Sequence, residues 1–191
     1  MVHDTIDPLH GGSIERSMQV SKSLAERGYQ IDLLSLKRNF NLDYAKKNGI
    51  KDIYIYNSIK LKYLLPIINP ITLMKLCKEY EIIHISKNWS MLSFFVALIA
   101  KKIKVPYIFS PMGWVSFTNN KSEYLKKIYF KYCTKFILIN CYYTITVSEN
   151  EYKNFNPKDP AALLKDLARN GGSKLRPALN SKIERGFLKN Y

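Results

Sequence analysis

The sequence lacks the residue patterns that mark metal, disulfide and catalytic-triad chemistry. Its three cysteines, Cys77, Cys133 and Cys141, are far apart and make no CxxC or Cys/His spacing. No zinc site is therefore predicted, and the odd count argues against a disulfide framework, so a reducing cytoplasm is the expected compartment. With only three histidines, no Ser/His/Asp or Cys/His arrangement can be assigned. No catalytic residue, metal or cofactor is predicted.

Long hydrophobic runs are also missing. The longest apolar stretch, residues 89–100, has about twelve residues, whereas a membrane-spanning helix needs roughly twenty. This stretch is therefore expected to be a buried helix. The N-terminus carries His3, Asp4 and Asp7 rather than a basic region before an apolar core, so no signal peptide is predicted.

Acidic residues are few. Fifteen acids stand against thirty Lys and Arg, which leaves a formal net charge of +15. The excess is uneven, because the segment from Lys101 to Lys135 holds eight lysines and one acid, Glu123. Such a charge indicates a partner that is nucleic acid, anionic lipid or a phosphorylated small molecule. No helix-turn-helix, RNP-like or zinc motif accompanies it, so nucleic acid is not a predicted partner.

Strand and helix patterns alternate about six times along the chain. Strands are predicted at residues 1–6, 29–36, 52–56, 82–86, 105–110 and 143–147, and helices at residues 13–27, 72–80, 89–100 and 120–140. This alternation predicts an α/β fold with a doubly wound, mainly parallel sheet. Ligands of such sheets bind beyond the carboxyl ends of the strands, where the loops at residues 7–13, 86–90, 110–117 and 148–151 are expected.

Two of these loops carry glycine or tryptophan. Gly11, Gly12 and Ser13 open a helix directly after the first strand, so a phosphate could approach the free N–H groups there. A plain tight turn is the equal alternative, because GxGxxG and a Walker lysine are absent. Trp89 and Trp114 each follow a strand; they could stack on a sugar or base, or close the top of the core.

The remaining polar candidates each allow two interpretations. His84 is expected to be a structural histidine, and His10 a surface residue or a ligand contact. Asp4 and Asp7 flank the end of the first strand. Solvent-facing capping is the expected role of these two carboxylates, and a general base is the alternative.

The predicted helix at residues 120–140 combines an apolar stripe with lysines. Core packing is the simplest explanation of the stripe, which consists of Leu125, Ile128, Tyr129, Tyr132 and Phe136. A solvated face is the simplest explanation of the lysines, and adsorption to anionic lipid is the alternative.

Several segments in register resemble the N-terminal domain of GT-B glycosyltransferases of the retaining, family-4 type. Residues 11–17 (GGSIERS) and 24–31 (LAERGYQI) resemble its opening GG-x-E-R … LA-x-RGH-x-V. Residues 81–90 (EIIHISKNWS) resemble its D-I-V-H-x-H … W-S strand and loop. Residues 105–114 (VPYIFSPMGW) resemble VPY-x-x-SPHGM, and residues 146–149 (TVSE) resemble T-x-V-S-E.

The end of the chain resembles the final helices of the same enzymes. Residues 156–163 (NPKDPAAL) and 175–179 (LRPAL) are similar to their P-x-DP-x-AL … LR-x-x-L. In the family a whole second Rossmann domain lies in between, so the joint near Phe155 predicts an internal deletion. Two parts are expected: residues 1–155, a Rossmann-like acceptor-side domain, and residues 156–191, a helical tail.

The resemblance implies a substrate-binding site at the loops. Gly12 and Ser13 would contact phosphate or acceptor, and the whole implied set is Gly11, Gly12, Ser13, Trp89, Met112, Gly113, Ser148 and Glu149. Met112 stands where the family has a histidine near the transferred sugar, and a thioether cannot replace its hydrogen bonds. The family's second domain, which holds the donor nucleotide, has no counterpart in these residues.

The implied function is hexosyl transfer from a nucleotide sugar to a polysaccharide or glycolipid acceptor. The missing donor half indicates an incomplete or remnant form, or a partner chain that supplies the missing domain. The alternative is a non-catalytic module that holds a lipid-linked sugar or an anionic membrane. In either case the expected location is cytoplasmic, with the inner face of the membrane as a peripheral site.

Overall fold

The computed structural model describes residues 1–7, 9, 11–37, 41–59, 65–112 and 121–146, without the side chains of residues 121–123. The chain divides into two units, Met1–Val147 and Ser148–Tyr191. The second unit lies outside the described residues, as does the predicted tail with its joint near Phe155. The division at residue 155 therefore stays a prediction.

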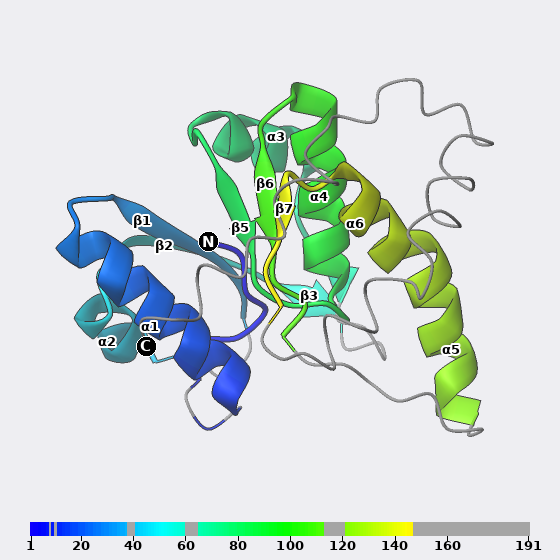
Figure 1. Cartoon of the computed structure of the whole chain (residues 1–191), viewed down its shortest axis with the longest axis horizontal. Coiled ribbons are helices and arrows are strands. Elements are labelled where there is room, and N and C mark those ends of the chain that lie inside the picture. Colours follow the sequence, from blue (N-terminus) through cyan, green and yellow to red (C-terminus); the bar gives the residue numbers. More distant parts are fainter. Residues whose placement is uncertain (8, 10, 38–40, 60–64, 113–120, 147–191) are drawn as a thin grey trace. The chain divides into compact units, whose positions relative to one another are not determined.

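Parallel strands form the centre of the first unit (Figure 1). One group pairs β1 (Ile31–Leu36) with β2 (Ile50–Tyr56), and the other runs β5 (Ile83–Ile85), β6 (Tyr107–Phe109) and β7 (Tyr143–Thr144). Val2 joins the two groups, because it bridges Leu34 and Ile85, both in parallel. Counted from the N-terminal segment, the order of these strands is 3-2-1-4-5-6, which is the order of Rossmann-type sheets. The predicted doubly wound, mainly parallel sheet is confirmed.

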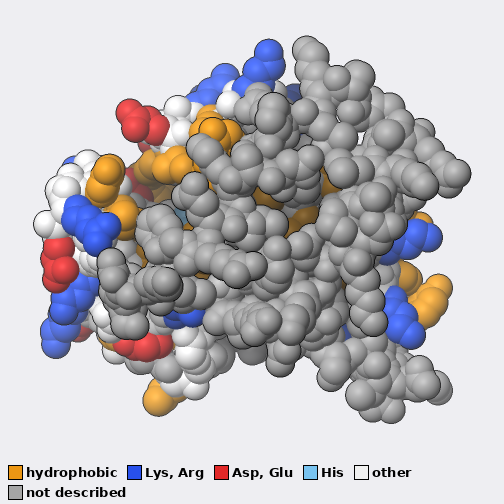
Figure 2. Space-filling view, viewed as in Figure 1, with side chains coloured by type: hydrophobic (Ala, Val, Ile, Leu, Met, Phe, Trp, Pro, Cys, Tyr) orange, Lys and Arg blue, Asp and Glu red, His pale blue; other side chains and the backbone are white. Residues whose placement is uncertain are grey.

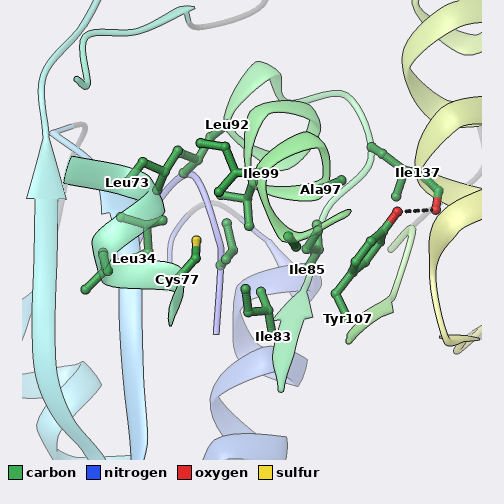
Figure 3. Close-up of a cluster of buried hydrophobic side chains, with 14 of the residues drawn as sticks. Leu34, Leu73, Cys77, Ile83, Ile85, Leu92, Ala97, Ile99, Tyr107 and Ile137 are labelled. Atoms are coloured by element: carbon green, nitrogen blue, oxygen red, sulfur yellow. Dashed lines mark hydrogen bonds between the residues drawn. The ribbon is translucent and has the colours of Figure 1, made fainter. Parts of the chain in front are cut away.

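Helices pack on both faces of this sheet. Leu33 of β1 belongs to a buried cluster with Ile14 and Met18 of α1 (Gly12–Glu26) and Ala45 of α2 (Leu42–Lys47). The neighbouring Leu34 belongs to the other buried cluster, which takes in side chains of α3 (Pro70–Lys78), α4 (Met91–Ile103) and α6 (Lys135–Asn140). Figure 3 shows this second cluster. Successive residues of a strand point to opposite faces, so β1 supplies both cores.

Three elements differ from the prediction. The N-terminal strand is reduced to bridges around Val2, although its backbone still pairs on both sides. The polar segment at residues 37–51 contains α2, whose only buried residue is Ala45; so short a helix has no apolar periodicity to reveal it. An unpredicted antiparallel pair, β3 (Ser58–Ile59) with β4 (Leu65–Pro66), lies before α3. Within the described ranges, none of the helices combines the length and apolarity that crossing a bilayer requires.

The predicted helix at residues 120–140 contains a π-helical turn. It consists of α5 (Lys121–Tyr129), the π-helix η2 (Phe130–Thr134) and α6. Core packing of the whole apolar stripe was a wrong expectation: Tyr129 is buried, but Leu125, Ile128 and Tyr132 are 44%, 38% and 62% exposed. The reason is that α5 runs away from the sheet (Figure 1) and that the π turn changes the phase of the helix.

Gly49 and Gly28 provide a matched test of the packing of α1. Both have left-handed φ angles, 79° and 89°. A Cβ at Gly49 would overlap the Cβ of Ala25 in α1, whereas a Cβ at Gly28 would meet nothing within 4 Å. We expect Gly28→Ala to lower the free energy of unfolding by about 1 kcal/mol through backbone strain. Gly49→Ala should cost at least about 2 kcal/mol because overpacking adds to the strain. Urea denaturation measures both, and equal losses would contradict close packing of Gly49 on α1.

Candidate functional site

The loops that follow neighbouring parallel strands meet at the carboxyl edge of the sheet. Five of the predicted site residues are described there: Gly11, Gly12 and Ser13 after the N-terminal segment, Trp89 after β5 and Met112 after β6. Gly113, Ser148 and Glu149 lie outside the described residues, and so does Trp114. The structure thus places one tryptophan and the glycine pair beyond strand ends, where ligands of such sheets bind.

Gly11, the N-cap residue of α1, provides no side-chain cap for the helix. Its φ is 97°, a backbone conformation that favours glycine. Gly12 is exposed, and a Cβ on it would meet no atom within 4 Å. Glu15 lies in the first turn, where hydrogen bonds from Tyr44 and Gln19 lower its pKa. The N–H groups of this first turn can bind an anion. The negative charge of the ionised Glu15 already interacts with the positive end of the helix, which weakens the attraction for a further anion.

Asp4 is buried and paired, so its expected solvent-facing capping role was wrong. The Lys87 ammonium donates to Asp4 Oδ1 at 2.8 Å, with the Asp4 side chain 6% exposed. The two residues stand after adjacent strands, the N-terminal segment and β5, and their pairing needs the strand order that only the fold provides. Asp7 does act locally, because its Oδ1 accepts the backbone N–H of Leu9.

The loop after β5 connects several strand ends. Its Asn88 N–H donates to the carbonyl of Pro111 after β6, at 3.0 Å. The hydroxyl of Ser93 donates to the Lys87 carbonyl at 2.8 Å. Together with the Lys87–Asp4 pair, these bonds hold the β5 loop against the ends of both neighbouring strands. The buried Asn88 and Ser93 were not singled out from the sequence, because nothing local distinguishes them from surface polar residues.

Trp89 is half-buried at the edge of the site. Its ring centroid lies 5.6 Å from that of Tyr129, with a tilt of 45° between the planes. This aromatic pair supports the core-closing interpretation for part of the ring. Since the side chain is only half-buried, it also keeps surface at the edge of the sheet, where stacking on a sugar would occur.

Met112 occupies a strained backbone position. Its φ is 56°, a left-handed conformation that costs a non-glycine residue roughly 1–2 kcal/mol. Strain of this kind is concentrated at functional loops. The side chain is half-buried and offers a thioether, a weak acceptor without a donor.

Two histidines are held neutral near these loops. Burial lowers the pKa of His3 to about 4, and nearby Lys87 lowers it further against the opposing effect of Asp4. The His3 Nδ1 lies 2.9 Å from the carbonyl of Thr5. Burial likewise lowers the pKa of His84 to about 4, and its Nε2 lies 2.8 Å from the Ser110 hydroxyl. His84 is the structural histidine that the sequence predicted. Within the described residues, no three His, Cys, Asp or Glu side chains come together as a metal-ligand set.

The neutral histidines predict an acid-sensitive fold. Their pKa of about 4 in the folded state lies below the ordinary 6.5, so the unfolded chain binds protons first as the pH falls. Stability is full above about pH 6.5 and declines towards pH 4, by about 1.4 kcal/mol per pH unit for each histidine. We expect His84→Gln to remove one such slope in urea denaturation between pH 7 and 4.5. Unchanged slopes in the variant would show that His84 takes up its proton at the same pH in the folded and unfolded chain, and would contradict the lowered pKa.

The sequence model described as Glycosyltransferase Family 4 matches residues 10–159, a range that contains all the motifs of the first domain. The crystal structure of a glycosyltransferase from Rickettsia africae ESF-5 matches at a TM-score of 0.44 and 16% identity, over 92% of this chain and 50% of that chain. The chain thus spans about half the length of that glycosyltransferase. No curated protein matches the sequence.

Proposed function

Because the chain belongs to glycosyltransferase family 4, we propose that residues 1–155 are the acceptor-side half of a glycosyltransferase. The reaction is hexosyl transfer from a nucleotide sugar to a polysaccharide or glycolipid acceptor. The observation that carries this proposal is the family match over residues 10–159. The positions of Gly12, Trp89 and Met112 beyond strand ends support it.

In this proposal the described residues contact different parts of the substrate. The N-terminus of α1 at Gly12 and Ser13 can bind a phosphate or an acceptor group, since the N-cap residue Gly11 has no side chain that could occupy the first-turn N–H groups. Trp89 offers a partly accessible ring for a sugar face. Met112 brings a sulfur where the family has an imidazole, so hydrogen bonding to the transferred sugar is weaker here.

The donor nucleotide calls for residues outside this half. Transfer from a nucleotide sugar requires stabilising charge on the departing diphosphate. In the loop after β5, the Lys87 ammonium is already neutralised by Asp4 at 2.8 Å. We infer that residues 1–155 act only with a nucleotide-binding half supplied elsewhere, in a partner chain or in a longer form of the protein, and are inactive as an isolated remnant.

Ligand titrations test this division. We expect uridine and guanosine diphosphates and their hexose conjugates to bind the chain no more tightly than about 1 mM by calorimetry, the range of weak contacts. Short glycan oligomers should instead shift the amide resonances of Gly12, Ser13, Trp89 and Met112. Gly12→Val should reduce the glycan shifts without unfolding the chain, because a side chain there enters open space. Micromolar, nucleotide-specific binding would contradict the donor-less half, and glycan shifts confined to other residues would contradict the site.

A second candidate function rests on one surface of α5 and the adjoining η2, which we name the α5 surface. Tyr124, Ile128 and Tyr132 are 69%, 38% and 62% exposed, and the exposed Lys127 and Lys131 share their side of the helix. Figure 2 shows hydrophobic and basic side chains next to each other at the edge where α5 lies. A helix that mixes exposed aromatic and basic residues suits the headgroup region of an anionic bilayer, where lysines keep their charge in water. This favours a non-catalytic module that binds an anionic membrane or a lipid-linked sugar at the membrane surface.

Vesicle sedimentation tests the α5 surface. We expect the chain to sediment with phosphatidylglycerol vesicles at low salt and not with neutral phosphatidylcholine vesicles. Lys127→Glu with Lys131→Glu should weaken binding at least about tenfold, since each surface lysine contributes about 1 kcal/mol. The matched control is Lys46→Glu with Lys47→Glu on α2, two exposed lysines of the other helical layer. Equal losses in both double variants would assign binding to the net charge, and no binding at low salt would remove the membrane function.

A further inference from the structure

The π turn η2 interrupts a helix that contains no glycine or proline. Residues 121–140 are helical throughout, with α5 before and α6 after the five π-helical residues Phe130–Thr134. Single π turns inside α-helices are rare and frequently occur at functional sites. The two residues at its boundaries, Tyr129 and Thr134, are 4% and 0% exposed, and both carry hydroxyl groups.

The π turn brings these two hydroxyl groups to the same side of the helix. In a regular α-helix, five residues correspond to about 500° of rotation, so Tyr129 and Thr134 would point about 140° apart. In a π-helix the backbone hydrogen bonds join residues i and i+5. Residues five apart therefore lie on nearly the same side of the helix, one turn above the other. Tyr129 Oη donates to the Ser90 carbonyl at 2.6 Å, and Thr134 Oγ1 donates to Asn88 Oδ1 at 2.7 Å.

Both bonds end on the loop that follows β5. Ser90 is the N-terminal cap residue of α4, and its side chain makes no cap bond, so the Tyr129 hydroxyl fixes the start of that helix through the carbonyl. Asn88 also donates its N–H to the Pro111 carbonyl after β6 at 3.0 Å. The bond from Thr134 is therefore relayed through Asn88 to the segment that carries Met112. Trp89 stands between the two clamped residues and packs on the ring of Tyr129.

We propose that the π turn is a clamp for the cleft, with Tyr129 and Thr134 as positioning residues for the loop that bears Trp89. They act through Ser90 and Asn88 and touch no substrate themselves. This inference rests on the proposed function, because the loop matters only if it lines a glycan site. A regular α-helix over the same residues would lose one of the two bonds, so the π turn is the feature that makes the clamp possible.

Amide hydrogen exchange in the full chain tests the clamp directly. Thr134→Val removes the hydroxyl with little change of shape and leaves the buried Asn88 oxygen without this donor, and Thr134→Ser restores the hydroxyl. In Thr134→Val we expect exchange at the Asn88 amide to rise about tenfold beyond any rise at two reference amides, those of Ile83 and Val105, which donate to the carbonyls of Pro106 and Ala100. In Thr134→Ser the Asn88 amide should return to within about threefold of the parent chain. Tyr129→Phe provides a second variant. In this variant the rate of hydrogen exchange should change at the Phe94 amide, which is bonded to the Ser90 carbonyl at 3.2 Å.

The outcomes separate the clamp from the proposed function. Exchange at Asn88 that rises only in step with Ile83 and Val105 would overturn the clamp, because a residue that merely stabilises the fold changes all of these amides together. Glycan titration of the same samples reports separately on the site. Faster Asn88 exchange together with weaker glycan shifts supports both proposals, whereas faster exchange with no glycan shifts even in the parent chain supports the clamp as a loop-positioning device and rejects the glycan site.

Discussion

The described sheet depends on the backbone pairing of one short segment around Val2. The Val2 N–H donates to the His84 carbonyl at 2.8 Å, and the Val2 carbonyl accepts the Ser86 N–H at 2.9 Å. On its other side, the His3 N–H donates to the Leu34 carbonyl at 3.1 Å. Without this segment, β1–β2 and β5–β6–β7 would be two separate sheets with facing edges. Buried backbone groups left unpaired cost about 1–3 kcal/mol each, so the inserted segment stabilises both halves at once.

The same insertion sets the point at which the winding of the sheet reverses. Connections on one side of the N-terminal segment place α1 and α2 on one face, and those on the other side place α3, α4 and α6 on the opposite face. Between the segment and β5 the direction of winding reverses, and ligands of doubly wound sheets bind beyond the carboxyl ends of the strands at such a point. Asp4 and Lys87 stand on either side of this reversal and are joined at 2.8 Å. Loss of Lys87 would leave the buried Asp4 carboxylate uncompensated, which is far more costly than the pair itself is stabilising.

Polar contacts around these strand ends are mostly directed inward. Asn88, Ser93 and Thr134 are almost fully buried. Ser93 donates to the Lys87 carbonyl and Thr134 donates to Asn88 Oδ1, so these neutral groups shape the loops and offer no charge to a ligand. This is consistent with the proposal that the donor nucleotide is held by another part of a larger enzyme.

Much of the fold could be predicted from the sequence because the signals are local. Alternating apolar runs predicted the parallel sheet, and residues 82–86 and 105–110 were placed within one to two residues of β5 and β6 at each end. Gly11 before α1 and the structural role of His84 followed from their immediate neighbours. The division at residue 155, Gly113, Ser148 and Glu149 remain predictions. The apolar stripe of the predicted helix at residues 120–140 was misjudged because periodicity identifies a face of a helix but not what covers it.

The sequence by itself determined the alternation of strands and helices, the glycine at position 11, where φ is positive, and the motifs of a glycosyltransferase family. Only the tertiary structure decided that Asp4 is buried against Lys87, 83 residues away, and that Tyr129 and Thr134 share one side through a π turn. The physical reason is that propensity and periodicity depend on neighbours within a few residues. The partner of a buried charge or hydroxyl depends instead on the order of the strands and on the phase of a packed helix.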